Sequence, residues 1–437
     1  CTACRTALRP ARHAGRERGA ATDIAAGGGG GGATQGDDIA LQKGASELPI
    51  NDQFYKGDAT RWITLANTLK LRLYNNTRLV DINASEKIKT LLDAGDLLDE
   101  NTEDFQFEYG QQRNNPNSRH PFYNAAYETD SPPYLNNYFM WLLAEEKQDG
   151  NGATIIDPRL RFYFYRQTRG DDQESINGFC FLASPDQKPQ HYLDVDARMP
   201  FCSLGNGYYG RDHGNGTGVP PDQSFRTAYG LYPGGGKFDE DSFSSILNSG
   251  TDGALGQGIN PIMLASFVDF MRAEAALTLN TGEDARALLE KGMRKSIEKV
   301  NSFAPLDGII PNCKIENLMV VKLCPFDVFV ADEEDIDRYV NVVLSKFDNA
   351  NTLDERLDII MKEYFIALWG NGLEAYNNYR RTCMPLQIQP HVEPAPGVYP
   401  RSLLYPSDHV NLNASVQQKN NRGQAVFWDT NPSSCTY

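Results

Sequence analysis

The sequence predicts a mainly α-helical protein in which helices pair into hairpins and long irregular loops connect the pairs. Apolar residues recur at helical spacing in three pairs of neighbouring segments, which predicts the hairpins. The stretches between them are rich in glycine, proline and aromatic residues and too irregular for long helices or strands. Because the pairs share no consensus of about 34 residues, they indicate divergent helical repeats and not a regular array.

The first hairpin is predicted shortly after Asp58, a residue type that caps helix N-termini. The apolar stripe of its first helix is Trp62, Leu65, Ala66, Leu69 and Leu73. A shorter helix is expected to open at Ser85 and to end at Gly95, because glycine readily adopts the left-handed conformation that terminates helices.

Two further hairpins are predicted in the C-terminal half. The first pairs helices over residues 261–279 and 285–300, with Leu264, Val268, Met271, Ala275 and Leu279 on one face of the first helix. The second pairs helices over residues 336–347 and 353–379. The proline-rich tail from residue 385 onward is expected to be irregular.

The last predicted helix is interrupted at Gly370-Asn371-Gly372, next to Trp369. We interpret the break as the end of one helix and the start of another, with the following arginines, Arg380 and Arg381, paired to acids nearby in the sequence. The alternative is that the break contacts a ligand or a partner.

Two loop-rich regions separate the hairpins. Residues 104–135 are polar and aromatic and are expected to form an exposed loop, and residues 166–250 form the second region. Between them, residues 137–144 resume an apolar run, and the aromatic alternation over residues 160–165 predicts a short strand or an extended segment.

The stretch from Gly207 to Asp239 is the most distinctive of the chain. Its glycines and the Pro220-Pro221 pair exclude a single helix or strand. Its tyrosines and phenylalanines carry more apolar surface than a disordered linker tolerates, so we expect an ordered loop. The polar side chains in it would either bond neighbouring backbone or contact a ligand.

The composition of the chain narrows the classes of function that it can have. The net charge of −15 argues against nucleic-acid binding, which usually needs a basic patch. The 21 Tyr, 21 Phe and 4 Trp are compatible with a surface that grips polyhydroxylated or peptide-like ligands, although most rings must fill the core. No run of roughly 18 or more apolar residues occurs, so no segment is predicted to span a membrane as a helix.

Residues 1–46 differ from the rest of the chain. They are rich in Ala, Gly and Arg, include six consecutive glycines, and cannot bury a core. They are therefore a linker, or the true residues differ from those written. Cys1 stands where a processed bacterial lipoprotein begins, which makes it the candidate lipid-anchor residue. Most of the eight cysteines are expected to be isolated thiols, with pairing of Cys180 with Cys202, or of Cys313 with Cys324, left open.

No motif for catalysis is present. The sequence lacks the serine-hydrolase elbow, the zinc-protease motif and the phosphate-binding loop, since Lys237 of GGGK is followed by Phe. A pair of carboxylates for glycoside hydrolysis would carry no sequence motif and stays open. Asp194 and Asp196, or Asp212 and Asn215, could bind calcium, but neither pair matches an EF-hand loop. We expect no enzyme, no cofactor and no bound metal.

Six segments of the chain, in a fixed order, carry a family resemblance. They are RWITLANTLKLRLYNNT (61–77), YLNNYFMWLL with DPRLRFYF (134–164), GYYGRDHG with YPGGGKFD (207–239), FMRAEAAL (270–277), EYFIALWGNGLEAYNNYRRTCMP (363–385), and RSLLYPSD with FWDTNP (401–432). In this order they resemble the SusD/RagB family of outer-membrane nutrient-binding lipoproteins. The resemblance implies a tetratricopeptide-like helical superhelix decorated by long loops. It also implies one domain over residues 47–437 with insertions at about 104–135 and 166–250.

The resemblance further implies function. Such a protein is anchored in the outer membrane by lipid and faces the cell exterior. It captures an oligomeric nutrient, glycan or peptide, and acts as a lid on a SusC-type TonB-dependent barrel transporter. A surface hydrolase on a helical scaffold and a pure interaction scaffold are the alternatives.

We expect the ligand to bind where loops 109–134 and 207–239 meet, because loops on a rigid scaffold commonly carry function. The candidate ligand-binding residues are Tyr123, Tyr127, Tyr208, Tyr209, Arg211, Asp212 and His213. The tyrosines would offer ring faces or hydroxyls, while the last three would bond the ligand or brace the loop.

Overall fold

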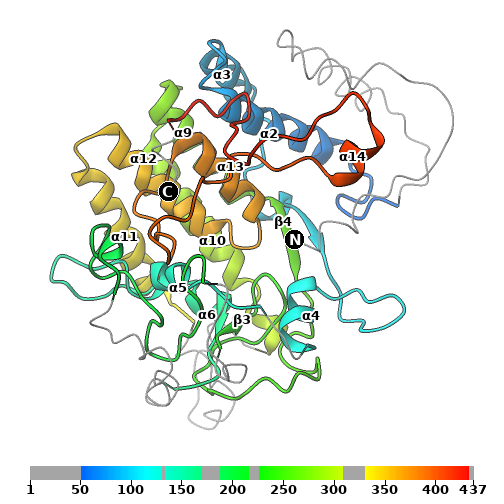
Figure 1. Cartoon of the computed structure of the whole chain (residues 1–437), viewed down its shortest axis with the longest axis vertical. Coiled ribbons are helices and arrows are strands. Elements are labelled where there is room, and N and C mark those ends of the chain that lie inside the picture. The colour runs from blue at the N-terminus through cyan, green and yellow to red at the C-terminus, as the bar shows by residue number, and fades with distance from the viewer. Residues whose placement is uncertain (1–50, 130–132, 170–187, 216–225, 309–329, 433–437) are drawn as a thin grey trace.

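The computed structural model describes residues 51–129, 133–169, 188–215, 226–308 and 330–432, and it is mainly helical, as predicted. The longer helices form one part of the molecule, and most of the short helices, together with long loops, form the other (Figure 1). The longer helices are α2 (Ala59–Thr77), α3 (Ala84–Ala94), α9 (Ala265–Leu279), α10 (Ala285–Asn301), α11 (Glu333–Asn349), α12 (Leu353–Ala367) and α13 (Gly372–Thr382). The short helices are α4 (Pro121–Tyr127), α5 (Asn137–Ala144), α6 (Leu160–Tyr163), α8 (Gln190–Leu193) and α14 (Ser407–Leu412).

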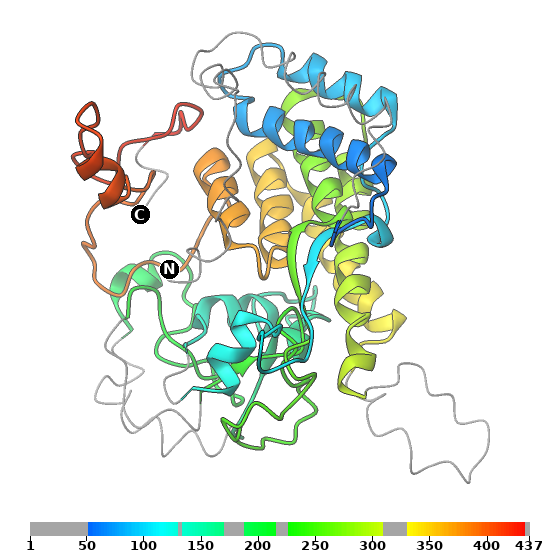
Figure 2. The same ribbon diagram turned by 90° about the vertical axis from the view of Figure 1, so that its right-hand side faces the viewer.

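Helices α2 and α3 form the first predicted hairpin. The Asp58 carboxylate accepts hydrogen bonds from the backbone N–H groups of Thr60 and Arg61, as expected of an N-cap. At the other end, Gly95 closes α3 with φ of 67°, a left-handed conformation that costs glycine little. Figure 2 shows the two helices side by side against the other long helices.

Helix α9 lies at the centre of the helical part. It contacts α2, α3, α10 and α12. The sequence predicted a single apolar face, but buried residues occur all around its first three turns, because neighbouring helices cover it on several sides. Its buried acids are paired: Glu274 forms an ion pair with Arg381 of α13 at 2.7 Å, and Asp269 with Lys295 of α10 at 2.8 Å.

Helix α9 also begins later than predicted. Residues 259–263 form strand β4 (Ile259–Met263), which pairs antiparallel with β1 (Phe105–Glu108). A second pair joins β2 (Phe164–Tyr165) to β3 (Ala228–Tyr229). The strand predicted over residues 160–165 is therefore mostly the short helix α6, with only its last two residues extended.

Two large hydrophobic clusters, and a smaller third one around Tyr123 and Tyr127, fill the interior of the described part of the chain. The first joins α2, α3 and α9–α12, and the second joins α5, α6 and the loops around residues 192–238 to the C-terminal ends of α10 and α12. Ile366 of α12 belongs to the second cluster, so this helix reaches from the helical part into the loop part.

A buried ionic network also joins the two parts. Arg159, with no exposed surface, forms an ion pair with Asp157 at 2.6 Å. Its guanidinium donates to Ser296 Oγ of α10 and to the hydroxyl of Tyr339 of α11, each at 3.0 Å. Glu363 of α12 lies 3.4 Å from the same guanidinium. Burial disfavours the charged form of Asp157, but the adjacent Arg159 charge outweighs burial and lowers the pKa of that carboxyl.

The acids around the helix break thus find partners far away in the sequence. Glu363 pairs with Arg159 and with Lys147, the latter at 2.9 Å, and Arg381 pairs with Glu274. The expectation that Arg380 and Arg381 pair with acids nearby in the sequence is wrong for Arg381. Arg380 instead donates to the carbonyl of Arg401 in the C-terminal segment.

The segment after residue 398 lies beside α13. The Tyr376 hydroxyl donates to the carbonyl of Pro400 at 2.5 Å, and the Asn431 side-chain amide donates to the carbonyls of Arg380 and Arg381 at 2.6 and 2.7 Å. Arg401 and Asp429 form a buried ion pair within the segment. These contacts hold the segment with α14 to one side of the helical part (Figure 2).

Candidate ligand-binding site

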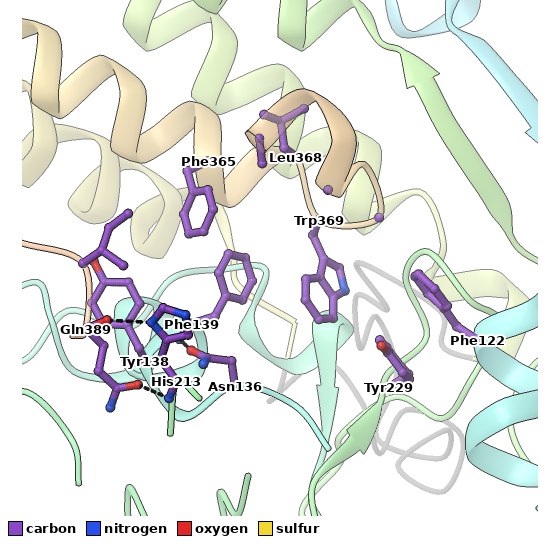
Figure 3. Close-up of a pocket in the computed structure, with 14 residues that line it drawn as sticks. Phe122, Asn136, Tyr138, Phe139, His213, Tyr229, Phe365, Leu368, Trp369 and Gln389 are labelled. Atoms are coloured by element: carbon purple, nitrogen blue, oxygen red, sulfur yellow. Dashed lines mark hydrogen bonds between the residues drawn. The ribbon is translucent and has the colours of Figure 1, made fainter. Parts of the chain in front are cut away.

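A cavity of about 400 Å³ lies where the helical part meets the loop part. Six of the fourteen described residues that line it are aromatic: Phe122, Tyr138, Phe139, Tyr229, Phe365 and Trp369. Volume and apolar lining are typical of a small-ligand pocket. Figure 3 shows these rings and the polar residues that accompany them.

The aromatic rings form a continuous series of contacts. The Trp369 ring stacks on Phe139, with ring centroids 5.0 Å apart and an interplanar angle of 17°. At the other end of the series, Phe122 stacks on Tyr229 with centroids 4.7 Å apart. Tyr229 in turn lies 5.7 Å from Trp369, so the rings line one wall without a gap.

The break between α12 and α13 positions Trp369. Gly370 has φ of 99°, a backbone conformation that residues with a side chain rarely adopt. A Cβ atom there would lie 2.9 Å from Pro233. Asn371 then caps α13 by accepting a hydrogen bond from the N–H of Glu374. The predicted change of helix is confirmed, and the structure also places Trp369, Gly370 and Gly372 on the cavity wall.

Polar groups gather at one end of the cavity. The N–H of His213 donates to Gln389 Oε1 at 3.0 Å, and the His213 ring Nδ1 lies 3.2 Å from the Gln389 carbonyl oxygen. Asn136 accepts the N–H of Phe139 at 3.0 Å as the N-cap of α5. Figure 3 shows His213, Gln389 and Asn136 together, away from Phe122 and Tyr229.

Both loops predicted to meet contribute to this cavity, but mostly through residues other than those expected. Loop 109–134 contributes Phe122, and loop 207–239 contributes His213 and Tyr229. Of the seven candidate residues, only His213 lies among the described lining residues, and its side chain is exposed.

The four tyrosines predicted to offer ring faces are buried. Tyr123 and Tyr127 have no exposed surface, and Tyr208 and Tyr209 retain 5% and 3%. Residues 121–127 form helix α4 instead of exposed loop, and this helix turns both of its tyrosines inward. A ring covered on both faces offers no surface for stacking, so the structure contradicts the expectation that these rings face a ligand.

Hydrogen bonds satisfy the buried hydroxyl groups of two of these tyrosines, Tyr123 and Tyr127. The Tyr123 hydroxyl donates to the carbonyl of Asp252 at 2.8 Å, and the Tyr127 hydroxyl to the carbonyl of Tyr229 at 2.6 Å. The two rings stack on each other with centroids 4.7 Å apart. Burial raises the pKa of Tyr123 to about 12. Both side chains therefore stabilise the loop part.

Asp212 braces the loop, which was one of its two expected roles. Its carboxylate accepts hydrogen bonds from Asn137 Nδ2, Gln389 Nε2 and the N–H of Cys202, at 3.1, 2.9 and 2.6 Å. Burial nevertheless raises the pKa of this carboxyl. The guanidinium of Arg211 lies 3.8 Å from the ring centre of Tyr134, a cation–π contact between loop 207–239 and loop 109–134.

Asp307 anchors the other end of the loop. Its carboxylate accepts the N–H of Phe238 at 2.9 Å, and burial raises its pKa from 3.8 to about 6. Because the folded-state pKa lies above the unfolded one, the free energy of unfolding should fall as pH rises from about 4 to about 6 and then level off.

Asp307→Asn is expected to stabilise the protein by about 1 kcal/mol above pH 6 and to have little effect near pH 4. Asparagine keeps an acceptor for Phe238 and removes the charge, and partial exposure of the side chain limits the gain. Urea denaturation at several pH values measures the difference, with the exposed Asp408→Asn as control. A difference that does not change with pH would contradict the assignment.

The described residues also bear on membrane-spanning helices, metal ligands and the state of the cysteines. In the described ranges, no helix is both long and apolar enough to cross a membrane, and no three His, Cys, Asp or Glu side chains are grouped to hold a metal ion. Cys202 and Cys383 are each disulfide-bonded, so these two are not isolated thiols. Cys1 and the Cys313–Cys324 pair lie outside the described residues.

Comparison with known proteins agrees with this fold. Residues 249–428 match the family model of SusD-like proteins, described as SusD and RagB outer membrane lipoproteins. A search of curated proteins finds no match.

Solved structures of similar fold come from Bacteroides. A SusD homologue of Bacteroides fragilis NCTC 9343 shares 18% identity over 91% of this chain and 73% of its own, with a TM-score of 0.60. A SusD homologue of Bacteroides thetaiotaomicron VPI-5482 shares 18% sequence identity over 91% of this chain and 72% of its own, with a TM-score of 0.54. An outer-membrane protein of Bacteroides vulgatus ATCC 8482, for which a role in nutrient binding has been suggested, shares 16% over 91% and 73%, with a TM-score of 0.57.

The architecture is thus the helical, loop-decorated SusD fold. The C-terminal part, residues 249–428, is the part whose sequence matches the model of the SusD and RagB outer membrane lipoproteins.

Proposed function

We propose that this protein is a lipid-anchored lipoprotein on the cell exterior that captures an oligomeric nutrient, a glycan or a peptide. It then delivers the nutrient to a SusC-type TonB-dependent transporter and acts as the lid of that barrel. The observation that carries the capture step is the aromatic cavity where the loops meet the helical part. The match of residues 249–428 to a model of outer membrane lipoproteins supports the location, and the partner follows from the resemblance to the SusD/RagB family.

The ligand site is best tested by closing the cavity. Gly372 lines it, and a Cβ atom built at Gly372 meets no atom within 4 Å, so the backbone there has open space beside it for a side chain. Gly372→Trp is expected to weaken ligand binding by about a hundred-fold or more, because the indole would occupy the space of the ligand.

Leu373→Trp is the matched control, since Leu373 is 70% exposed on the same helix and is not among the lining residues. Affinities for a panel of oligosaccharides and peptides, measured by calorimetry, give the comparison. An equal loss of ligand affinity in both variants, or no loss in either, would show that the ligand binds elsewhere on the protein. Recovery of a β-barrel partner from native membranes tests the transporter step separately.

The hydrolase alternative has no support in the cavity. None of the described residues that line it is acidic, whereas glycoside hydrolysis needs a pair of carboxyl groups across the scissile bond. Product release from the same panel of oligosaccharides and peptides would show an enzyme directly. A pure interaction scaffold would bind neither class of ligand.

A further inference from the structure

The chemistry of the cavity bears on which part of a ligand it can accept, and this question rests on the proposed function above. None of the fourteen described lining residues is Asp, Glu, Lys or Arg. A charged group placed in the cavity would lose water and find no opposite charge among these residues, which is strongly unfavourable. The group that enters is therefore uncharged.

The side-chain amide of Gln389 at the polar end is already used. Gln389, with 1% of its surface exposed, accepts the N–H of His213 and donates its amide hydrogens to Pro200 O and Asp212 Oδ1 at 3.0 and 2.9 Å. The Asn136 oxygen is engaged in capping α5. The His213 ring keeps one nitrogen, Nε2, without a hydrogen-bond partner among the described residues.

A bare sugar ring fits this arrangement poorly. Each hydroxyl that loses water without gaining a partner costs roughly 1–3 kcal/mol, and a sugar ring carries several. Trp369, the side chain on which a sugar would stack, is already stacked on Phe139 and on Tyr163, with centroids 5.0 and 5.7 Å apart. Face-on stacking is thus largely supplied by the protein's own rings.

The aromatic wall instead suits another ring. Trp369 Nε1 is buried and has no hydrogen-bond partner within the described part of the chain. Figure 3 shows this nitrogen on the side of the indole toward Phe122 and Tyr229. A ligand ring beside it could accept the N–H on its π face, or through an oxygen substituent, and could pack edge-to-face against the neighbouring rings.

The volume agrees with one ring and its linker. A dry apolar cavity of about 150 Å³ is enough to bind benzene. The cavity here has about 400 Å³, which leaves room for the atoms that join the ring to the remainder of a ligand.

We propose that the cavity binds an uncharged aromatic group carried on a polar chain, with the chain leaving past His213. The group is held by the rings of Phe122, Tyr229 and Trp369, and His213 is placed to hydrogen-bond the polar chain. An aromatic peptide side chain and an aryl substituent on a sugar both have this chemistry, and paired probes distinguish them.

Two probe pairs test the proposal on the full chain. The peptide pair is Gly-Phe-Gly with Gly-Ala-Gly, and the sugar pair is 4-nitrophenyl β-glucoside with methyl β-glucoside. In at least one pair, the ring-bearing probe is expected to bind about ten-fold or more tightly than its partner. The preference should vanish in Gly372→Trp and persist in Leu373→Trp, and the pair that shows it identifies the source of the ring.

Three outcomes would overturn the inference: no preference within either pair, no detectable binding of any probe, or a preference that survives Gly372→Trp. Maltoheptaose and a long polar peptide serve as ring-free ligands in the same experiment. Suppose that one of these ligands binds the wild-type chain and loses its binding in Gly372→Trp, while neither probe pair shows a preference for the ring. In that case the inferred aromatic specificity is wrong, and the proposed capture function stands.

Discussion

Replacing Arg159 by methionine is expected to lower the free energy of unfolding by about 3–5 kcal/mol, because it leaves two buried carboxylates without their shared cation. Asp157 has no exposed side-chain surface, and Glu363 keeps 2%. Lys147 would still neutralise Glu363, but Asp157 would lose both of its short bonds to the guanidinium, at 2.6 and 2.8 Å. The change also removes the donors to Ser296 and Tyr339.

Urea denaturation followed by circular dichroism measures the loss. Arg286→Met is the control, because Arg286 pairs with Asp348 on the surface, where such pairs contribute about 0–1 kcal/mol. Arg159→Lys keeps the charge and should lose less than the methionine variant. A methionine variant within about 1 kcal/mol of the wild type would contradict a stabilising role for the network.

The helices could be predicted from the sequence because their signals are local. The capping carboxylate of Asp58 and the left-handed Gly95 act within a few residues, and both are found where expected. The ionic network could not be predicted in this way. Arg159 and Glu363 are 204 residues apart in the chain, and Asp157-Pro158-Arg159 carries only the signal of a break.

Tyr123→Ala is expected to cost about 3–5 kcal/mol, the effect typical of truncating a large buried aromatic side chain. The ring is fully buried, stacks on Tyr127 and lies under the guanidinium of Arg119, 5.4 Å from the ring centre. Tyr123→Phe keeps the packing and loses only the hydrogen bond to Asp252, so about 1 kcal/mol is expected.

Thermal and urea denaturation of the two variants give the comparison. The control is Tyr405→Ala, since the Tyr405 side chain is 41% exposed and its truncation should change stability by less than about 0.5 kcal/mol. If Tyr123→Ala unfolded like the control, the burial of loop 109–134 would be wrong, and the ring would return as a candidate for ligand contact.

The tyrosines show why sequence located the region of the site better than its residues. An aromatic side chain in a polar, proline-containing stretch has the same sequence signal whether it faces a ligand or the core. Tyr123 and Phe122 are adjacent, yet α4 directs the first into the core and the second to the cavity. Tertiary packing makes that choice.

Trp369 is the cavity residue that the sequence could have pointed to, because it stands beside a helix break bounded by glycines. The break can be explained by helix capping alone. Pro233 and Pro261, the residues that a Cβ atom at Gly370 would meet, are distant in the chain. Phe139 gave no signal, since it lies within a continuous apolar run.

The cavity walls come from separate stretches of the chain that extend from Phe122 in α4 to Gln389 beyond α13. A molecule bound there touches parts of the protein that become neighbours only in the folded state, so it binds the native chain and not the unfolded one. By mass action, occupancy at a hundred times Kd adds about 2.7 kcal/mol to the stability of the entire fold. We therefore expect the melting temperature of the protein to rise in the presence of any molecule that fills the cavity.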